Sequence, residues 1–202
     1  MKQIVLGTCC LAILLSLGCG GGKPKRVDAP TIDADGAAAE AMNLYDTDKN
    51  GKIEKAELDA TPSMKSVLSS LDTNGDGGID KNEIATRIKA WQASKVGLSC
   101  PQITFTFKGK PVKSGEVVLT PEPFLGPNLK EAKGSINDGN CSPSSEGNID
   151  NLPGMAYGFY TITIQNAQPS LPADKKWGIE ISDQNPVVQE TGGSYPVDLS
   201  AK

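Results

Sequence analysis

Two twelve-residue stretches of the sequence carry oxygen-bearing side chains at regular intervals. Residues 46–57 read Asp-Thr-Asp-Lys-Asn-Gly-Lys-Ile-Glu-Lys-Ala-Glu, and residues 72–83 read Asp-Thr-Asn-Gly-Asp-Gly-Gly-Ile-Asp-Lys-Asn-Glu. Calcium takes about six to eight oxygen ligands, so a site needs several carboxylates or amides that converge from one tight turn. Each stretch therefore predicts one Ca²⁺ site. The expected ligands, with a main-chain carbonyl at the seventh position, are Asp46, Asp48, Asn50, Lys52, Glu54 and Glu57 in the first loop and Asp72, Asn74, Asp76, Gly78, Asp80 and Glu83 in the second.

The other positions of the two loops fit the same geometry. Gly51 and Gly77 stand at the sixth position, where the chain must turn sharply. Ile53 and Ile79 stand at the eighth, which suits a short pairing of the two loops. On these residues, the segment from about Gly36 to Trp91 resembles the EF-hand family, whose members pair two helix-loop-helix units. The alternative is two ordinary polar turns, because Asp, Asn and Gly dominate turns for reasons unrelated to metal.

Helices must position these loops. Apolar residues repeat at helical spacing before each loop and after the second one. After the second loop, Ile84, Ile88 and Trp91 form a stripe that predicts core packing between helices, with a partner-binding groove as the alternative. Only a short connection separates the loops, so the helices there must be short, which favours structural or buffering calcium over a sensor that opens widely.

Charge differs between the two loops. Lys49, Lys52 and Lys55 offset the acidic groups of the first loop, whereas Lys81 is the lysine of the second. We therefore expect the second loop to attract calcium more strongly. Its additional glycines act in the opposite direction, because ordering them costs more entropy.

The N-terminal region predicts export. An apolar run from Ile4 to Leu17 has the length of a signal-peptide core, so residues 1–18 are expected to be a signal peptide. The run ends before Gly18, Cys19 and further glycines, and this region resembles the cleavage and lipidation site of bacterial lipoproteins, which implies a lipid on Cys19 and tethering to a membrane. Secretion after cleavage nearby and an uncleaved anchor are the alternatives. Residues 19–35 are predicted to form a flexible tether.

The predicted export determines which cysteines can pair. Cys9 and Cys10 would be lost with the signal, so that Cys100 and Cys141 remain beside Cys19. In an oxidising compartment we expect Cys100 and Cys141 to form a disulfide; two unpaired buried thiols are the alternative.

From about Leu98 onward the spacing changes to the alternation of β-strands. Alternating segments at residues 103–107, 116–120 and 159–165 predict a small antiparallel sandwich over residues 98–202. The Gly/Pro-rich segment 109–121 and the Leu152-Pro153 turn before the strand at Gly158 resemble carboxypeptidase-regulatory-like, or transthyretin-like, domains. That resemblance implies a scaffold and carries no reaction chemistry.

Composition excludes several functions. The chain has no histidine, which removes the commonest general base, and it has 24 acidic against 20 basic residues, which gives no basic face for nucleic acid. We therefore expect no enzyme activity. Tyr157, Phe159 and Tyr160 could form an aromatic sugar platform, although alternating aromatics in a strand are more often core residues.

Together these patterns predict an α+β two-domain protein, in which an all-α EF-hand pair (residues 36–93) is joined through residues 89–97 to an antiparallel β-sandwich. We expect it to bind two calcium ions outside the cytoplasm, tethered by a lipid to a bacterial membrane or secreted. Two alternative functions are a calcium-dependent docking module like the dockerins, with an unidentified surface protein as partner, and a surface glycan-binding accessory module.

Overall fold

The computed structural model describes residues 27–148, 151–172 and 175–200. The first part of the chain is helical apart from two short strands. In chain order its elements are α1 (Ala34–Tyr45), β1 (Lys52–Glu54), the 3₁₀ helix η1 (Glu57–Ala60), α2 (Pro62–Lys65), α3 (Leu68–Leu71), β2 (Gly78–Asp80) and α4 (Lys81–Ser94). The short helices expected between the two loops are present, since α2 and α3 have four residues each.

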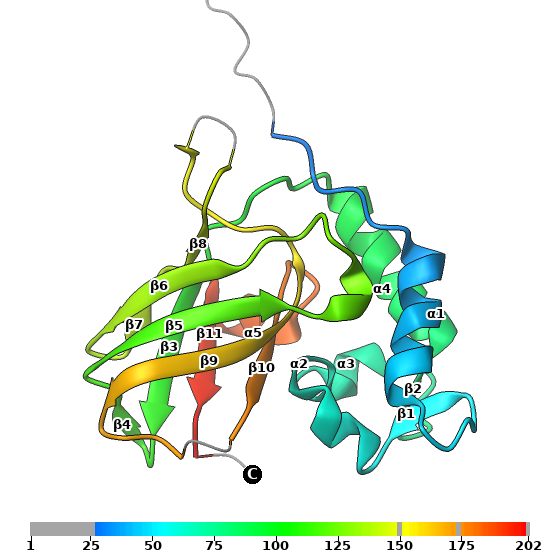
Figure 1. Ribbon diagram of the computed structural model, residues 1–202, viewed down its shortest axis with the longest axis horizontal. Coiled ribbons are helices and arrows are strands. Elements are labelled where there is room, and N and C mark those ends of the chain that lie inside the picture. The colour runs from blue at the N-terminus through cyan, green and yellow to red at the C-terminus, as the bar shows by residue number, and fades with distance from the viewer. Residues whose placement is uncertain (1–26, 149–150, 173–174, 201–202) are drawn as a thin grey trace, which may run out of the picture.

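The second part is mainly β. Its elements are β3 (Gln102–Phe107), β4 (Lys110–Pro111), β5 (Ser114–Pro121), the 3₁₀ helix η2 (Pro123–Leu125), β6 (Ala132–Asn137), β7 (Asn140–Cys141), β8 (Ser144–Ser145), β9 (Gly158–Gln168), β10 (Trp177–Ile181), α5 (Pro186–Thr191) and β11 (Ser194–Asp198). The three strands predicted from alternation correspond to β3, β5 and β9. Helices followed by a large, mostly antiparallel sheet confirm the α+β class (Figure 1).

The two long helices form because the sequence supplies caps and helix-forming residues. Asp33 caps α1 by accepting a hydrogen bond from the Gly36 main chain. Asp80 and Glu83 make a reciprocal capping box at the start of α4. Alanines line the buried face of α1, and their small side chains let α1 lie close along α4. These caps begin each helix at a defined residue and thereby fix where the loops attach.

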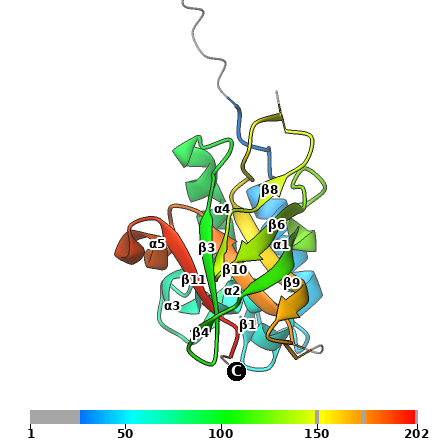
Figure 2. The same ribbon diagram turned by 90° about the vertical axis from the view of Figure 1, so that its left-hand side faces the viewer.

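The strands form one curled sheet in the order β10-β9-β5-β6-β7-β3-β11, with β4 paired to β3 and β8 paired to β6. Figures 1 and 2 show its strands curving around a common interior, with the helical part against one side. The pairings are antiparallel except at the end, where β11 runs parallel to β3 from Ser194↔Gln102 to Asp198↔Thr106. Alternation within a strand does not encode its partner's direction, so this pairing was not predicted.

Helices and sheet share one hydrophobic core. The cluster of buried residues runs continuously from Ile32 and the α1 alanines to Leu199. Trp91 of α4 packs edge-on against Phe159 of β9, with 4.8 Å between ring centroids. α2 lies directly over β10 at Gly178. The apolar stripe Ile84, Ile88 and Trp91 is therefore core, as the first of its two interpretations predicted.

A buried carboxylate ties the two parts together. Glu122, which precedes η2, is 4 % exposed. Its Oε2 accepts a hydrogen bond from the Tyr45 hydroxyl of α1 at 2.7 Å, and its Oε1 accepts one from the Ser63 hydroxyl of α2 at 2.6 Å. Burial and the bond to Glu122 raise the pKa of Tyr45, so Tyr45 stays a neutral donor.

Replacing Tyr45 by Phe should destabilise the protein by about 1–3 kcal/mol, because a buried carboxylate loses a donor. Chemical denaturation followed by circular dichroism would measure the free energy of unfolding. Leu44→Ala is the control, since the neighbouring Leu44 is 44 % exposed and should contribute much less. Equal stability of Tyr45→Phe and the natural protein would show that this bond does not hold α1 to the sheet.

The predicted disulfide is wrong for the described structure, in which Cys100 and Cys141 are free thiols. Cys141 is buried opposite Ile103 on β3, whereas exposed Cys100 lies three residues before Ile103 and bonds to the Pro153 carbonyl. Three residues of extended chain span about 10 Å, beyond the Cα separation that a disulfide bridges. Burial raises the pKa of the Cys141 thiol to about 11, so it remains protonated.

The aromatic sugar platform is also not formed. Phe159 and Tyr160 are fully buried, and the Tyr160 hydroxyl donates to the Ala156 carbonyl inside the core. Tyr157 is partly buried against the same cluster. Only Tyr157 of the three keeps an exposed part, so the three rings form no common surface for a sugar.

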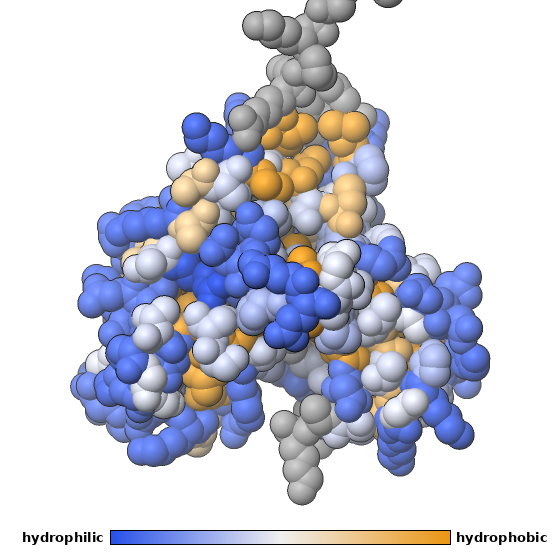
Figure 3. All heavy atoms as spheres, turned by 180° about the vertical axis from the view of Figure 1, so that it is seen from behind, coloured by the Kyte–Doolittle hydropathy of each residue, from blue (hydrophilic) through white to orange (hydrophobic). Residues whose placement is uncertain are grey.

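The surface is mostly hydrophilic when seen from behind, and hydrophobic residues gather towards the end where α4 finishes (Figure 3). Within the described residues, no helix is long and apolar enough to span a bilayer. The predicted signal peptide and Cys19 lie outside the described residues.

Candidate calcium site

The two loops lie side by side. β1 and β2 pair antiparallel through Lys52↔Asp80, Ile53↔Ile79 and Glu54↔Gly78. Ile53 and Ile79, at the eighth position of each loop, are fully buried beneath this pairing. α1 leads into the first loop, and α3 and α4 flank the second. The sequence thus predicted the pairing of the loops, and the structure supplies its register.

The first loop folds around its own side chains. The Asn50 main chain donates to Asp46 Oδ1 and Asp48 Oδ1, both at 3.1 Å. The Gly51 main chain donates to Asp46 Oδ2 at 3.0 Å. At the end of the loop, Glu57 accepts hydrogen bonds from Thr47 at 2.6 Å and from the Glu54 main chain at 3.1 Å.

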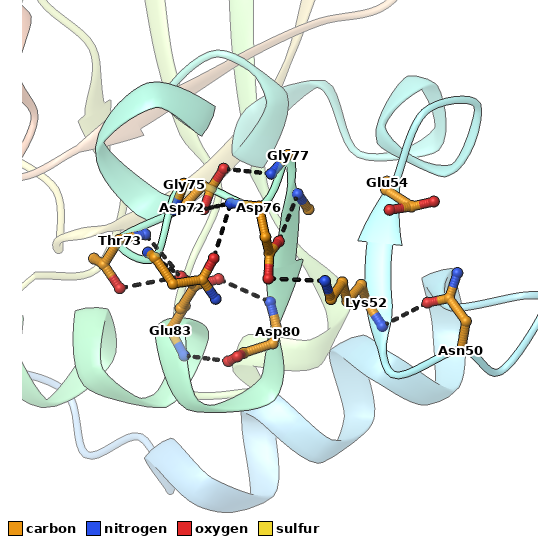
Figure 4. A network of polar contacts seen from close by, with 12 residues as sticks. Asn50, Lys52, Glu54, Asp72, Thr73, Gly75, Asp76, Gly77, Asp80 and Glu83 are labelled. Carbon is orange, nitrogen blue, oxygen red and sulfur yellow. Dashed lines mark hydrogen bonds and ion pairs between the residues drawn. The ribbon is translucent and has the colours of Figure 1, made fainter.

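The second loop repeats these bonds position by position (Figure 4). The Asp76 main chain donates to Asp72 Oδ1 at 3.1 Å and to Asn74 Oδ1 at 2.9 Å. The Gly77 main chain donates to Asp72 Oδ2 at 2.8 Å. Glu83 accepts from Thr73 at 2.7 Å and from the Asp80 main chain at 2.9 Å.

The backbones match as well. The sixth positions, Gly51 and Gly77, have φ of 90° and 86°, and the fourth positions, Lys49 and Gly75, have φ of 59° and 73°. Ordinary turns need not share both a backbone path and a hydrogen-bond set over twelve residues. The repeated geometry thus favours a common ligand over two unrelated polar turns.

The donor set fits calcium. Carboxylate oxygens of Asp46, Asp48 and Glu57 all lie within 4.8 Å of one another, close enough to share one ion. Hydrogen bonds from the main chain of Glu54 and the side chain of Thr47 lower the pKa of Glu57, which keeps it charged. In the second loop, Asp72 and Asn74 converge on one main-chain nitrogen and Glu83 closes the loop from α4. Hard carboxylate and amide oxygens are the ligands that calcium prefers.

Two predicted ligands are engaged elsewhere in the structure. Glu54 Oε1 makes an ion pair with Lys55 at 2.6 Å. Asp76 Oδ2 makes one with Lys52 at 2.8 Å (Figure 4). The sequence predicted that Lys52 serves the first loop through its main-chain carbonyl. In the structure, its side chain also reaches the second loop. No local signal in the sequence indicates this contact, because it depends on the register in which β1 and β2 pair.

Comparisons with known proteins support the resemblance of the helical part to the EF-hand family. The model of the EF hand family matches residues 39–60 and 64–88, which include the whole of both loops. These matches indicate calcium binding by this region. No curated protein matches the chain. A solved structure titled "Crystal structure of (S)-allantoin synthase" is similar at 14 % identity and a TM-score of 0.27, covering 85 % of this chain and 69 % of that one. A likeness that weak carries no argument about fold or function.

Proposed function

We propose that this protein binds two calcium ions, one in each loop, and uses them to stabilise its fold or to buffer calcium. The observation that carries the proposal is the shared geometry of the loops, with ligand side chains at the same positions and the same hydrogen bonds to the main chain. In each loop, the side chains at positions 1, 3, 5 and 12 and the carbonyl at position 7 would hold the ion, and Glu54 and Asp80 would contribute at position 9.

A structural role is favoured because the helices are fixed. Arg87 of α4 donates from Nη2 to the Ser70 carbonyl of α3 at 2.7 Å and from Nη1 to the Gln184 carbonyl beyond β10 at 2.8 Å. Separating α3 from α4, as a calcium sensor does on opening, would break the bond to Ser70. In the apolar stripe of α4, Trp91 already packs against Phe159 of the sheet, and Ile84 and Ile88 are fully buried, whereas a docking module would need to expose this stripe. We therefore do not propose docking through this face.

The setting of the protein forms the other part of the proposal. The apolar run before Cys19 supports export with lipid attachment to a bacterial membrane, or secretion. The turn motifs of the sheet support a transthyretin-like scaffold without enzyme activity. Extracellular calcium modules typically have Kd values of about 10⁻⁴ to 10⁻³ M, and we expect this range here.

Calorimetric titration of residues 20–202 with calcium tests the proposal. The natural sequence should bind two ions, and Glu57→Gln and Glu83→Gln should each lose one, because each removes the charged ligand that closes its loop. Calcium should also raise the melting temperature, because each bound ion adds about 2.7 kcal/mol to the free energy of unfolding at a hundred times its Kd. Asp59→Asn is the control, since exposed Asp59 lies just outside the first loop and pairs with Lys65. Absence of binding at millimolar calcium would refute the proposal and show that the two loops are ordinary polar turns.

A further inference from the structure

Lys52 serves both loops. Its main chain belongs to the first loop, where its carbonyl stands at the seventh position. Its side chain crosses to the second loop, and its Nζ lies 2.8 Å from Oδ2 of Asp76, the fifth-position ligand there. The charge that the sequence assigned to the first loop therefore acts on the second.

The pairing of β1 with β2 leaves room for the Lys52 side chain. Gly78 lies beneath it, and a Cβ added at Gly78 would come within 3.1 Å of Lys52 Cβ and 3.2 Å of Lys52 Cδ. The missing side chain at this position leaves room for the lysine stem between β1 and the second loop. Lys52 is 37 % exposed along its side chain, so its ammonium group sits at the rim of the loop in contact with solvent.

We propose that Lys52 is an internal competitor for calcium at the second loop and that the first loop consequently fills first. This inference rests on the proposed function. A calcium ion in the second loop must replace the ammonium group as the partner of Asp76 and must then tolerate a positive charge close by. Coulomb's law for a divalent ion about 5 Å from a unit charge in water corresponds to roughly a tenfold weaker affinity.

In the first loop, a lysine side chain competes with calcium less strongly than Lys52 does in the second. Lys55 pairs with Glu54, but its side chain is 85 % exposed to solvent. Glu54 is at the ninth position, which often reaches calcium through a water molecule, so its engagement affects the ion less than that of Asp76. Asp46, Asp48 and Glu57 already converge within 4.8 Å. The order of filling is therefore opposite to the order expected from counting lysines along the sequence.

Single-loop variants separate the two sites. In Glu83→Gln, calcium titration reports the first loop; in Glu57→Gln, it reports the second. We expect the first loop to bind more tightly at low ionic strength. Adding Lys52→Met to Glu57→Gln should tighten the second loop about fivefold to tenfold, and the gain should shrink in 0.5 M salt because added salt screens the repulsion. Lys49→Met in the same background is the matched control, since it removes one positive charge from the disabled first loop.

The outcomes are distinct. A second loop that binds more tightly than the first, or a Lys52→Met effect within twofold of the Lys49→Met effect, would overturn the inference while leaving two-ion binding intact. Loss of binding in both single-loop variants and in the natural sequence would instead refute the proposed function.

Discussion

Replacing Gly178 by Ala is expected to destabilise the protein by about 3 kcal/mol or more, a large effect for one methyl group. The added Cβ would lie 2.0 Å from the Ser63 nitrogen and 2.3 Å from the Pro62 carbonyl carbon. Both are main-chain atoms of α2, so no side-chain rotation can relieve the overlap. α2 would have to move away from β10, which would also strain the bond from Ser63 to Glu122. Thermal unfolding should show a melting temperature lower by about 6–12 °C.

Gly115→Ala is the matched control for this variant. Gly115 also lies in a strand, β5, but its added Cβ would meet the Ile164 side chain at 3.1 Å and main-chain atoms only at 3.4 Å. We expect a loss of less than about 1 kcal/mol there. If Gly178→Ala proved as stable as Gly115→Ala, the close contact between α2 and β10 would not be a feature of the folded protein.

Replacing Arg87 by Met should cost about 3–5 kcal/mol at neutral pH, because it leaves a buried carboxylate without its positive partner. Arg87 Nη1 lies 3.7 Å from Oε1 of Glu180, which is completely buried in β10. Trp91 and Ser182 donate hydrogen bonds to the same oxygen, at 2.9 Å and 2.5 Å. Denaturant titration of the variant and the natural protein would measure the difference in the free energy of unfolding.

The cost should depend on pH. Burial raises the pKa of Glu180 above its ordinary value of 4.5, Arg87 opposes that rise, and the nearby Asp183 adds to it. Without Arg87 the folded-state pKa rises further. An acid with a raised folded pKa favours folding below its unfolded pKa, and this advantage is lost as the pH rises through the folded pKa. The Arg87→Met variant should therefore be less impaired at pH 5 than at pH 8.

Two further variants test this explanation. Adding Glu180→Gln to Arg87→Met should recover part of the stability at pH 8, because it removes the uncompensated charge. Lys89→Met is the control on the same helix, since Lys89 pairs with Asp35 across exposed surface and should contribute less than about 1 kcal/mol. A pH-independent loss in Arg87→Met would assign its role to packing and main-chain hydrogen bonds alone.

The loops could be predicted from the sequence because their requirements are local. Twelve consecutive residues contain both the ligands and the glycines that allow positive φ, so the spacing of Asp46 to Glu57 suffices. The strands β3, β5 and β9 were predictable for the same reason, because alternation is read along one segment. Capping by Asp80 and Glu83 is equally local.

What the sequence did not predict depends on contacts between distant segments. The path of Lys52 to Asp76 follows from the register of β1 and β2, and the parallel pairing of β11 with β3 follows from how the sheet curls. The disulfide between Cys100 and Cys141 was predicted from the number of cysteines left after cleavage. In the sheet, however, Cys141 lies opposite Ile103, three residues along the chain from Cys100. The buried Glu180, which looks like a surface residue of a strand, is explained only by the position of α4.

The continuous core between helices and sheet has a consequence for amide hydrogen exchange. Slow exchange in β9 and β10 requires the core to open, and that core also holds Trp91 and Ile88 of α4. A ligand that binds the folded loops makes every such opening rarer, by the same factor, wherever the amide lies. Calcium added at one end of the molecule should therefore slow exchange in strands that do not touch the ion, and the protection gained there reports its affinity.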